Sequence, residues 1–333
     1  MFTDKTILIT GGTGSFGQQC IRMLFERWAP KKVIVFSRDE MKQWDMQQAF
    51  PKEQFPALRF FVGDVRDKER LYRAMRGVDI LIHAAALKIV PTAEYNPFEA
   101  IRTNIIGTEN VVSTALDCGV KKAVMLSTDK AVSPANLYGA TKLCAEKMFV
   151  AGNAYSGESG TRFCAVRYGN VVGSRGSVVP LFLKQREKGL ITITDSRMTR
   201  FWITLRQGVD FVLSSLEMSV AGEIFVPKLP TMHITDLAKA ICPDCEVKFT
   251  GIRPGEKLHE TMLSVDEARH TQEQKDRFII KPLFSFSTPG KTDWGTPVPE
   301  GFEYNSESNP WKLDEEELTR MLIELDPCYN GPK

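Results

Sequence analysis

The sequence lacks the long apolar run that would carry it through a membrane and the excess of charge that would draw it to a nucleic acid. No apolar stretch approaches the roughly 18 to 20 residues of a membrane-spanning helix. The 43 Lys and Arg residues almost balance the 41 Asp and Glu residues, so the net charge of +2 gives no broad basic field. Residues 1–10 have the pattern of a short strand rather than a signal peptide. We therefore expect a cytoplasmic protein that binds neither membranes nor nucleic acids.

Cysteine and histidine are scarce and lack the spacing of a metal site. The seven cysteines are odd in number and lie mostly in apolar stretches, which favours a reducing compartment over a disulfide framework. Cys242 and Cys245 have metal or redox spacing, but no second pair or His partner follows, so a chance spacing in a loop is the preferred interpretation. We expect no catalytic metal, because the four histidines are scattered: His83, His233, His259 and His270.

Apolar runs of strand length alternate with amphipathic helical patterns through the first half of the chain. The runs are continuous rather than alternating with polar residues, which indicates parallel strands covered on both faces. We expect an α/β fold, with a Rossmann-type doubly wound parallel sheet and a smaller α/β C-terminal lobe that binds substrate. The predicted strands lie at residues 6–10, 33–36, 59–62, 79–84, 123–127 and 163–167.

The regular alternation of strand and helix patterns ends after Asn170, and shorter, mixed elements follow. We therefore assign residues 1–170 to the nucleotide-binding domain, with a return of the chain to its sheet at about 196–228. Residues 171–195 and 229–333 are assigned to the substrate-binding lobe.

A glycine-rich turn joins the first predicted strand to the first helix, as in dinucleotide-binding folds. Gly12, Gly14 and Gly17 satisfy G-x-G-x-x-G, and Gly11, Gly14 and Gly17 satisfy the wider spacing of short-chain dehydrogenases. The N-terminal amides and dipole of the helix then meet the cofactor phosphates. The predicted contacts here are Gly11, Thr13, Gly14, Ser15, Phe16 and Gly17.

The end of the second strand favours NADP over NAD. Ser37 and Arg38 stand where an NAD-binding protein usually carries an acidic residue for the ribose, and a hydroxyl with a guanidinium suits a 2′-phosphate. Asp39 and Glu40 are close enough to leave NAD open. Further cofactor contacts are expected at the ends of the third and fourth strands, where ordinary packing is the alternative: Asp64, Val65, Ala84, Ala85 and Ala86.

A tyrosine and a lysine, Tyr138 and Lys142, lie four residues apart on one face at the start of a predicted helix. The segment Ser127-Thr128-Asp129-Lys130 follows the fifth strand, and ligands in such sheets bind beyond the carboxyl ends of the strands. A neighbouring Lys and a cationic nicotinamide both lower the pKa of a tyrosine. We therefore expect Tyr138 to take a proton from an alcohol during hydride transfer.

These motifs make the sequence similar to the extended short-chain dehydrogenase/reductase family, with Thr128 in the place of an active-site Ser or Thr. Within that family the chain resembles the inverting UDP-N-acetylglucosamine 4,6-dehydratases, the hydro-lyases that begin pseudaminic acid synthesis. The Asp129-Lys130 pair is the most discriminating feature, because the second member is Glu in dehydratases that act on dTDP-glucose. The strings that carry the resemblance span nearly the whole chain: S-T-D-K-A, Y-G-A-T-K, R-Y-G-N-V, M-T-R-F-W-I-T and I-R-P-G-E-K.

The resemblance implies a mechanism in which Tyr138 takes the 4-hydroxyl proton as hydride passes from C4 to NADP+. Lys130 then removes the C5 proton, Asp129 protonates the departing 6-hydroxyl, and hydride returns to C6, so NADP is held tightly and recycled at each turnover. Lys130 must be neutral to act as a base, and we expect Lys142 or the cofactor charge to depress its pKa. An inert salt bridge between Asp129 and Lys130 is the alternative.

The resemblance also implies the partners: a UDP-sugar substrate and further copies of the chain. Assembly into a homo-oligomer, either a dimer or a hexamer, is expected through long helices such as residues 97–117. Arg253 suits the diphosphate because of its planar guanidinium, whereas Arg197, Thr199 and Arg200 are weaker candidates. The substrate contacts expected are Lys88, Asn170, Arg197, Thr199, Arg253 and Glu256.

Three other functions are consistent with parts of the pattern. A nucleotide-sugar 4-epimerase would use Tyr138 but has no need of Asp129 and Lys130. A retaining dehydratase would share the chemistry but not the stereochemical outcome at C5, which only the resemblance predicts. A non-catalytic NADP-binding sensor is disfavoured because the Tyr, Lys, Asp and Thr set is intact.

Overall fold

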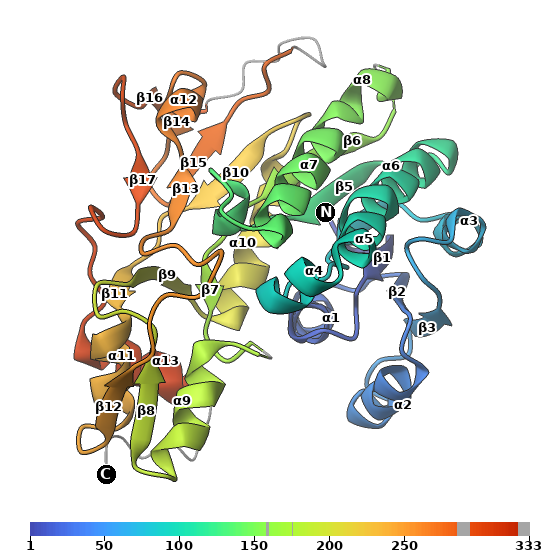
Figure 1. Cartoon of the computed structure of the whole chain (residues 1–333). Coiled ribbons are helices and arrows are strands. Elements are labelled where there is room, and N and C mark those ends of the chain that lie inside the picture. The colour runs from blue at the N-terminus through green and yellow to red at the C-terminus, as the bar shows by residue number, and fades with distance from the viewer. Residues whose placement is uncertain (158–159, 175, 285–293, 326–333) are drawn as a thin grey trace.

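A computed structural model describes residues 1–157, 160–174, 176–284 and 294–325 of the chain (Figure 1). Its main sheet has the strand order β16-β14-β15-β10-β6-β5-β4-β1-β2-β3 within the described residues. The register is parallel from β10 to β3, and Leu8 pairs with both Ile34 and Leu81. The six strands predicted from the first half of the chain are confirmed: β1 (Thr6–Thr10), β2 (Lys32–Ser37), β3 (Leu58–Val62), β4 (Ile80–His83), β5 (Lys122–Leu126) and β6 (Arg162–Val166).

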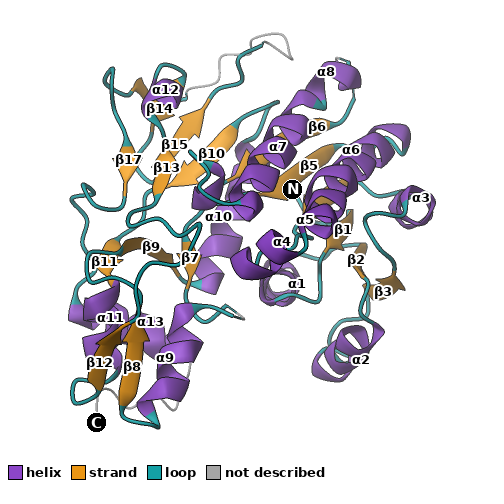
Figure 2. Ribbon diagram, in the orientation of Figure 1, coloured by secondary structure: helices purple, strands orange, loops and turns teal. Residues whose placement is uncertain are grey.

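Helices cover both faces of this sheet, which explains why its central strands are apolar along their whole length (Figure 2). Leu8 points toward α3 (Lys68–Met75), α6 (Gly107–Asp117) and α7 (Leu137–Ala151) and joins one hydrophobic core. Its neighbours Ile7 and Ile9 point to the other face and join the core formed with α1 (Ser15–Arg27), α2 (Glu40–Ala49) and α10 (Leu205–Met218). Both cores are needed to bury a two-sided sheet.

The helical stretch predicted at 97–117 contains a π-helical segment. Helix α5 (Pro97–Ile101) runs into η1 (Arg102–Ile106) and then α6, while α4 (Val90–Tyr95) precedes it. The wide turn places Asn104 so that its amide bonds the backbone N–H and C=O of Leu87, at 2.8 and 2.9 Å, and the hydroxyl of Thr141, at 3.0 Å. This helix thereby fixes both the segment after β4 and the first turns of α7, which α8 (Asn153–Ser156) follows.

The chain re-enters the main sheet after residue 203 through α10 (Leu205–Met218) and β10 (Ile224–Pro227). Helix α10 packs beside α1, and β10 pairs in parallel with β6. The sheet then continues beyond the predicted boundary at residue 228, because β15 (Arg277–Ile280) pairs antiparallel with β10. Strands β14 (Thr271–Glu273) and β16 (Thr296–Pro297) extend this antiparallel edge.

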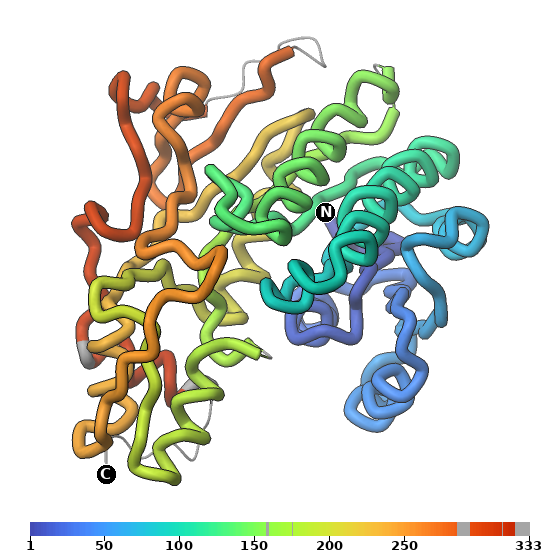
Figure 3. The backbone as a smooth tube through the Cα atoms, in the orientation of Figure 1, coloured from blue at the N-terminus to red at the C-terminus, as the bar shows by residue number. Residues whose placement is uncertain are grey.

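The second lobe is built from segments between and after these crossings, as the path in Figure 3 shows. One part packs α9 (Val178–Arg186), α11 (Ile234–Ile241) and α13 (Glu315–Leu325) around the parallel pair β8 (Leu190–Ile193) and β12 (Glu246–Phe249). The other part holds a three-stranded sheet, β11 (Thr231–His233), β9 (Thr199–Ile203) and β7 (Asn170–Val171). Strand β13 (Thr261–Leu263) pairs with β17 (Tyr304–Asn305), and α12 (Val265–Ala268) follows β13.

The cysteine expectation is wrong for one pair of residues. Cys242 and Cys245 are joined by a disulfide between the end of α11 and the start of β12, where a chance spacing of free thiols was expected. The chain turns back between these two elements, and this turn brings the two side chains together. Cys20, Cys118, Cys144 and Cys164 are free, and Cys328 lies outside the described residues. No helix in the described part of the chain is both long and apolar enough to span a membrane.

Candidate active site

A cavity of about 1130 Å³ lies where the carboxyl ends of the parallel strands face the second lobe. It brings together nearly all of the predicted site residues from both halves of the chain. Gly17, Arg197 and Thr199 are the predicted residues that do not line it. The site therefore runs from the glycine-rich turn to the loop that carries Arg253.

The glycine-rich turn is shaped by close backbone approaches. Gly11 has a φ of 67°, and a Cβ there would lie 2.9 Å from the backbone of Ala85. At Gly17 a Cβ would lie 2.3 Å from the carbonyl oxygen of Gly12, so this residue packs the helix against the turn instead of lining the cavity. Helix α1 begins at Ser15, and its N-cap residue, Gly14, has no side chain to bond the first backbone N–H groups of the helix. These N–H groups therefore stay available to an anion.

Basic and acidic side chains meet at the far end of β2. Arg38 is half-exposed and lies 3.7 Å from Asp64, measured from Nη1 to Oδ2. Asp39 caps α2 by accepting a hydrogen bond from the backbone of Lys42 and also pairs with the Lys42 ammonium at 2.8 Å. The Ser37 hydroxyl accepts a hydrogen bond from Gln43. Lys42, which lines the cavity, was missed because its role depends on the turn from β2 into α2.

The neighbouring walls come from the two predicted strand ends. Val65, just after β3, and the small residues Ala84 to Ala86, just after β4, line the cavity beside Gly11. Small side chains here leave room for a flat group against the sheet.

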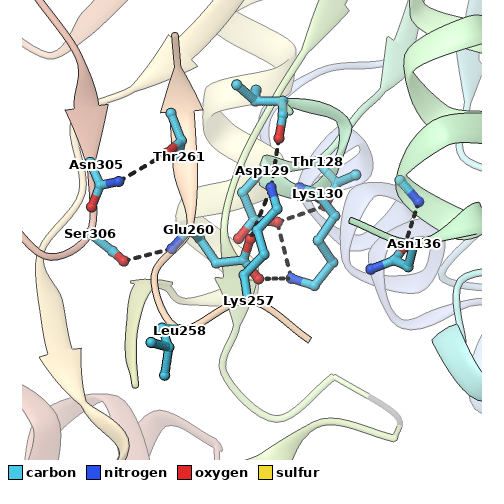
Figure 4. Close-up of polar contacts among 12 residues, drawn as sticks. Thr128, Asp129, Lys130, Asn136, Lys257, Leu258, Glu260, Thr261, Asn305 and Ser306 are labelled. Carbon is cyan, nitrogen blue, oxygen red and sulfur yellow. Dashed lines mark hydrogen bonds and ion pairs between the residues drawn. The ribbon is translucent and has the colours of Figure 1, made fainter. Parts of the chain in front are cut away.

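The predicted acid and base lie on η2 (Asp129–Ala131), directly beyond β5 (Figure 4). Asp129 is 1% exposed, and its Oδ1 accepts hydrogen bonds from Thr128 Oγ1 at 2.8 Å and from Lys130 Nζ at 3.1 Å. Within the described structure, Asp129 Oδ2 has no hydrogen-bond partner. The Asp129 carboxylate is therefore buried, while the Lys130 ammonium that donates to it is partly exposed and lines the cavity.

The expected depression of the Lys130 pKa is wrong. Burial lowers this pKa, but the carboxylates of Asp129 and Glu260 outweigh burial and raise it above its ordinary value. Glu260 comes from the second lobe, and its Oε1 lies 3.2 Å from Lys130 Nζ. Lys130 is therefore an ammonium in this arrangement, held between two carboxylates.

Tyr138 and Lys142 occupy the start of α7, and the pKa of Tyr138 is raised rather than lowered in this structure. Burial raises the pKa of Tyr138 to about 12, although Lys130 and a hydrogen bond with Thr128 lower it. Burial lowers the pKa of Lys142 to about 8, against the opposing effect of Glu146. Lys142 Nζ donates to the carbonyl of Leu126 at 2.7 Å, which orients the ammonium along the end of β5.

The second lobe supplies a group of charges around Lys130. Glu260 is buried and lies 3.8 Å from Arg200 Nε and 3.9 Å from Lys257 Nζ. Lys257 also donates to the carbonyl of Val132 at 2.6 Å, so the lobe is tied to the segment after η2. Glu260 was missed because it lies three residues beyond the quoted I-R-P-G-E-K string and no spacing rule links it to Lys130.

The predicted substrate contacts divide into two groups. Lys88 and Asn170 line the cavity, as do Arg253 and Glu256 on a loop held by a hydrogen bond from Asn136 to Gly255. Arg197 instead points into solvent and pairs with Asp195 at 2.9 Å. Thr199 is buried and bonds His259 and Ser306. Among the described residues no group of three His, Cys, Asp or Glu side chains is arranged to hold a metal ion.

Comparison with known proteins agrees with this arrangement. Residues 7–282 match the sequence model of a family described as polysaccharide biosynthesis protein. Two UDP-N-acetylglucosamine 4,6-dehydratases (inverting) from Campylobacter jejuni strains are each 52% identical over 97% of this chain and 98% of their own length. A UDP-glucose 4-epimerase from Rickettsia conorii is 44% identical over 84% of both chains.

Solved structures show the same fold. The structure of Pen from Bacillus thuringiensis is 38% identical, covers 97% of this chain and 98% of its own, and superposes with a TM-score of 0.89. The dTDP-glucose 4,6-dehydratase DesIV from Streptomyces venezuelae, solved with NAD and TYD bound, is 23% identical, with 76% and 86% covered and a TM-score of 0.67. The chain thus belongs to the polysaccharide biosynthesis protein family, a group of short-chain dehydrogenase/reductase type whose members include the inverting UDP-N-acetylglucosamine 4,6-dehydratases.

Proposed function

We propose that the protein is an NADP-dependent UDP-N-acetylglucosamine 4,6-dehydratase that inverts C5 and yields UDP-2-acetamido-2,6-dideoxy-β-L-arabino-hex-4-ulose. The observation that carries the proposal is the buried Asp129-Lys130 contact beside Tyr138 on one cavity. Oxidation at C4 needs the tyrosine, and loss of water across C5 and C6 needs an acid and a base as well. The full-length similarity to the two Campylobacter jejuni enzymes supports the same reaction.

The residues of the cavity fit a pyridine dinucleotide. The turn from Gly11 to Gly14 and the open amides of α1 would hold the diphosphate, and Lys142 would contact the nicotinamide ribose. Arg38 and Lys42 would meet a 2′-phosphate, since the nearby acid Asp39 is engaged in capping α2. When bound, the nicotinamide ring takes up a hydride and gives it back, so the cofactor is held through the cycle.

Tyr138 would take the proton of the 4-hydroxyl as C4 is oxidised. Its pKa of about 12 means that the phenol is protonated at neutral pH before substrate and cofactor bind. Lys130 and Thr128 act to lower that pKa, and a nearby positive charge would lower it further. The ketone produced at C4 then makes the C5 proton acidic.

The Asp129-Lys130 pair can reach its working form by an internal proton shift. Movement of one proton from Lys130 Nζ to Asp129 Oδ1, across 3.1 Å, produces a neutral amine and a carboxylic acid. The amine takes the C5 proton, the C6–O bond breaks, and the acid gives its proton to the departing hydroxyl as water. Return of the hydride to C6 would leave an enolate, and a proton from solvent added at C5 on the opposite face would complete the inverted product. The pair ends as ammonium and carboxylate, its starting form, so the raised pKa of Lys130 is compatible with its role as a base.

A UDP-sugar would span the second half of the cavity. Arg253 would pair with the diphosphate, while Lys88, Asn170 and Glu256 would contact the rest of the substrate. The buried Oδ1 of Asn170 has no hydrogen-bond partner in the described structure, which suits an acceptor for a sugar hydroxyl. We no longer assign this role to Arg197 and Thr199, because neither reaches the cavity.

The product and the assembly of the enzyme complete the proposal. The inverted 4-keto-6-deoxy sugar would enter pseudaminic acid synthesis for a surface or flagellin glycan. Exposed apolar side chains on α4 and α5, including Tyr95 and Phe98, favour a homo-oligomer, either a dimer or a hexamer. Light scattering on the purified protein measures which assembly forms.

A 4-epimerase is the second candidate, since the Rickettsia conorii relative at 44% identity is described as one. The deciding experiment incubates the purified protein with UDP-N-acetylglucosamine in deuterium oxide, without added cofactor, and follows the sugar by NMR. A 4-keto-6-deoxy product with deuterium at C5 and arabino configuration supports the proposal. The xylo configuration would reject inversion, whereas UDP-N-acetylgalactosamine as the sole product would show an epimerase.

A further inference from the structure

The ammonium of Lys130 lies between carboxylates from both lobes. Asp129 Oδ1 is 3.1 Å from Nζ on one side, and Glu260 Oε1 is 3.2 Å away on the other (Figure 4). Glu260 stands directly before β13, and its backbone N–H donates to Ser306 Oγ at 2.9 Å. Its carboxylate is therefore anchored to the substrate lobe, while Asp129 is anchored to the nucleotide-binding domain.

The burial of Glu260 is costly for a residue that only packs. Glu260 is 2% exposed, and its Oε2 has no hydrogen-bond partner in the described structure. Burying an acceptor without a hydrogen bond is unfavourable, even with the Lys257 ammonium 3.9 Å from Oε2, so an apolar side chain would join the lobes at lower cost. The contact of Oε1 with Lys130 Nζ, at 3.2 Å, explains why a carboxylate rather than an apolar group stands at this position.

The remaining charges around Lys130 come from four other elements. Arg200 on β9 and Lys257 in the loop before β13 face Glu260 at 3.8 and 3.9 Å. Tyr138 on α7 and Lys88 after β4 are close enough for Lys130 to lower the pKa of each. Glu260 is thus the carboxylate from the second lobe that reaches the Lys130 amine among the described residues.

A fixed carboxylate beside an amine has two effects on proton transfer. It favours the ammonium, so the neutral amine becomes a stronger base toward a weakly acidic C–H bond. It also limits where Nζ can lie, because the amine must stay within reach of both carboxylates. Both effects act on removal of the C5 proton and neither acts on binding of the UDP group.

We propose that Glu260 is a positioning residue which, from the substrate lobe, holds the Lys130 amine against C5 and strengthens it as the base of the elimination. The inference rests on the proposed dehydratase function. It adds a third carboxylic side chain to the Asp129-Lys130 pair and makes removal of the C5 proton depend on the docking of the two lobes.

The first test measures the ionisation of Lys130 directly and needs no substrate. Protein labelled with ¹³C at lysine Cε is titrated by NMR, and the Lys130 signal is assigned by its absence from Lys130→Arg. We expect the signal in Glu260→Gln to titrate at least one pH unit below that of the wild type. Coincident curves, or two curves that both stay flat across the range in which the proteins remain folded, overturn the proposal.

The second test follows the C5 proton during turnover. With C5-deuterated UDP-N-acetylglucosamine, Glu260→Gln should lower kcat at least tenfold and raise the isotope effect on kcat, with KM changed less than threefold. Glu260→Asp keeps the charge but withdraws it by one methylene, so it should also raise the isotope effect while titrating close to the wild type. An unchanged isotope effect in either variant contradicts the positioning role.

Glu223→Gln is the matched control. Glu223 is equally buried, at 2% exposed, but its carboxylate accepts hydrogen bonds from the backbone of Val220 and Ala221 outside the cavity. It should leave the Lys130 titration and the isotope effect unchanged. Formation of UDP-N-acetylgalactosamine alone by the wild type would refute the dehydratase function, and the NMR titration would still report whether Glu260 sets the ionisation of Lys130.

Discussion

Substitution of Arg167 by methionine should destabilise the whole protein, because this residue holds a buried ionic network together. Arg167 is fully buried at the end of β6, and its guanidinium bonds both oxygens of Glu146 on α7, at 2.9 and 2.6 Å. It also bonds both oxygens of Glu267 on α12, at 2.9 and 2.6 Å. Loss of the guanidinium would leave two carboxylates without their counter-ion, one of them fully buried.

The size of the effect follows from this burial. Removing one partner of a buried ion pair costs about 3–5 kcal/mol. The two pairs do not contribute twice this amount, since the Glu267 side chain is 18% exposed and partly hydrated. At roughly 2 °C per kcal/mol for a chain of this size, Arg167→Met should lower the melting temperature by about 6–10 °C.

The assay is thermal unfolding of Arg167→Met beside Arg269→Met, whose ion pair with Asp266 is exposed and should contribute about 0–1 kcal/mol. Burial raises the pKa of Glu267, but Arg167 outweighs it and holds that pKa below its ordinary value. This contribution is present above the unfolded-state pKa and is lost as pH falls through the folded-state pKa, so the difference between Arg167→Met and wild type should narrow in acid. A melting temperature within about 2 °C of wild type at neutral pH would refute the reasoning.

Three further predictions concern the active site. Asp129→Asn and Lys130→Met should each lower formation of the 4-keto-6-deoxy product by about 10²–10⁴-fold. Oxidation at C4 should remain visible as reduced cofactor. Loss of C4 oxidation together with loss of the elimination would contradict a role for these two residues in the elimination alone. Tyr138→Phe should instead abolish the appearance of reduced cofactor, and normal C4 oxidation would show that another group takes the hydroxyl proton. Arg38→Ala should weaken NADP binding by about 10–100-fold and leave NAD binding nearly unchanged, as measured by calorimetry; an equal loss for both would argue against a 2′-phosphate contact.

The strands and helices of the first half were predictable because each depends on a local pattern. Continuous apolar runs such as residues 6–10 and 123–127 appear as buried strands of nearly the same bounds. The antiparallel edge was not predictable, since β14, β15 and β16 are short and join the sheet only through the pairing of β15 with β10, which lies earlier in the chain. The π-helical turn at Arg102–Ile106 was also hidden, because its side-chain contacts with Leu87 and Thr141 are tertiary.

In the active site, the positions of the residues were predictable from local patterns, but their ionisation was not. The positions of Asp129, Lys130 and Tyr138 followed from a strand end and a helix start, and the structure brings all three to one cavity. Their ionisation did not follow, because the pKa of Lys130 is raised first by Asp129 and then by Glu260, which lies 130 residues later in the sequence. A cationic neighbour alone would favour loss of the lysine proton, whereas a lysine between two carboxylates keeps it. For the proposed dehydratase, the base of the elimination would therefore depend on a carboxylate from each lobe, and a proton shift to Asp129 across 3.1 Å, rather than loss of the proton to water, would make Lys130 neutral.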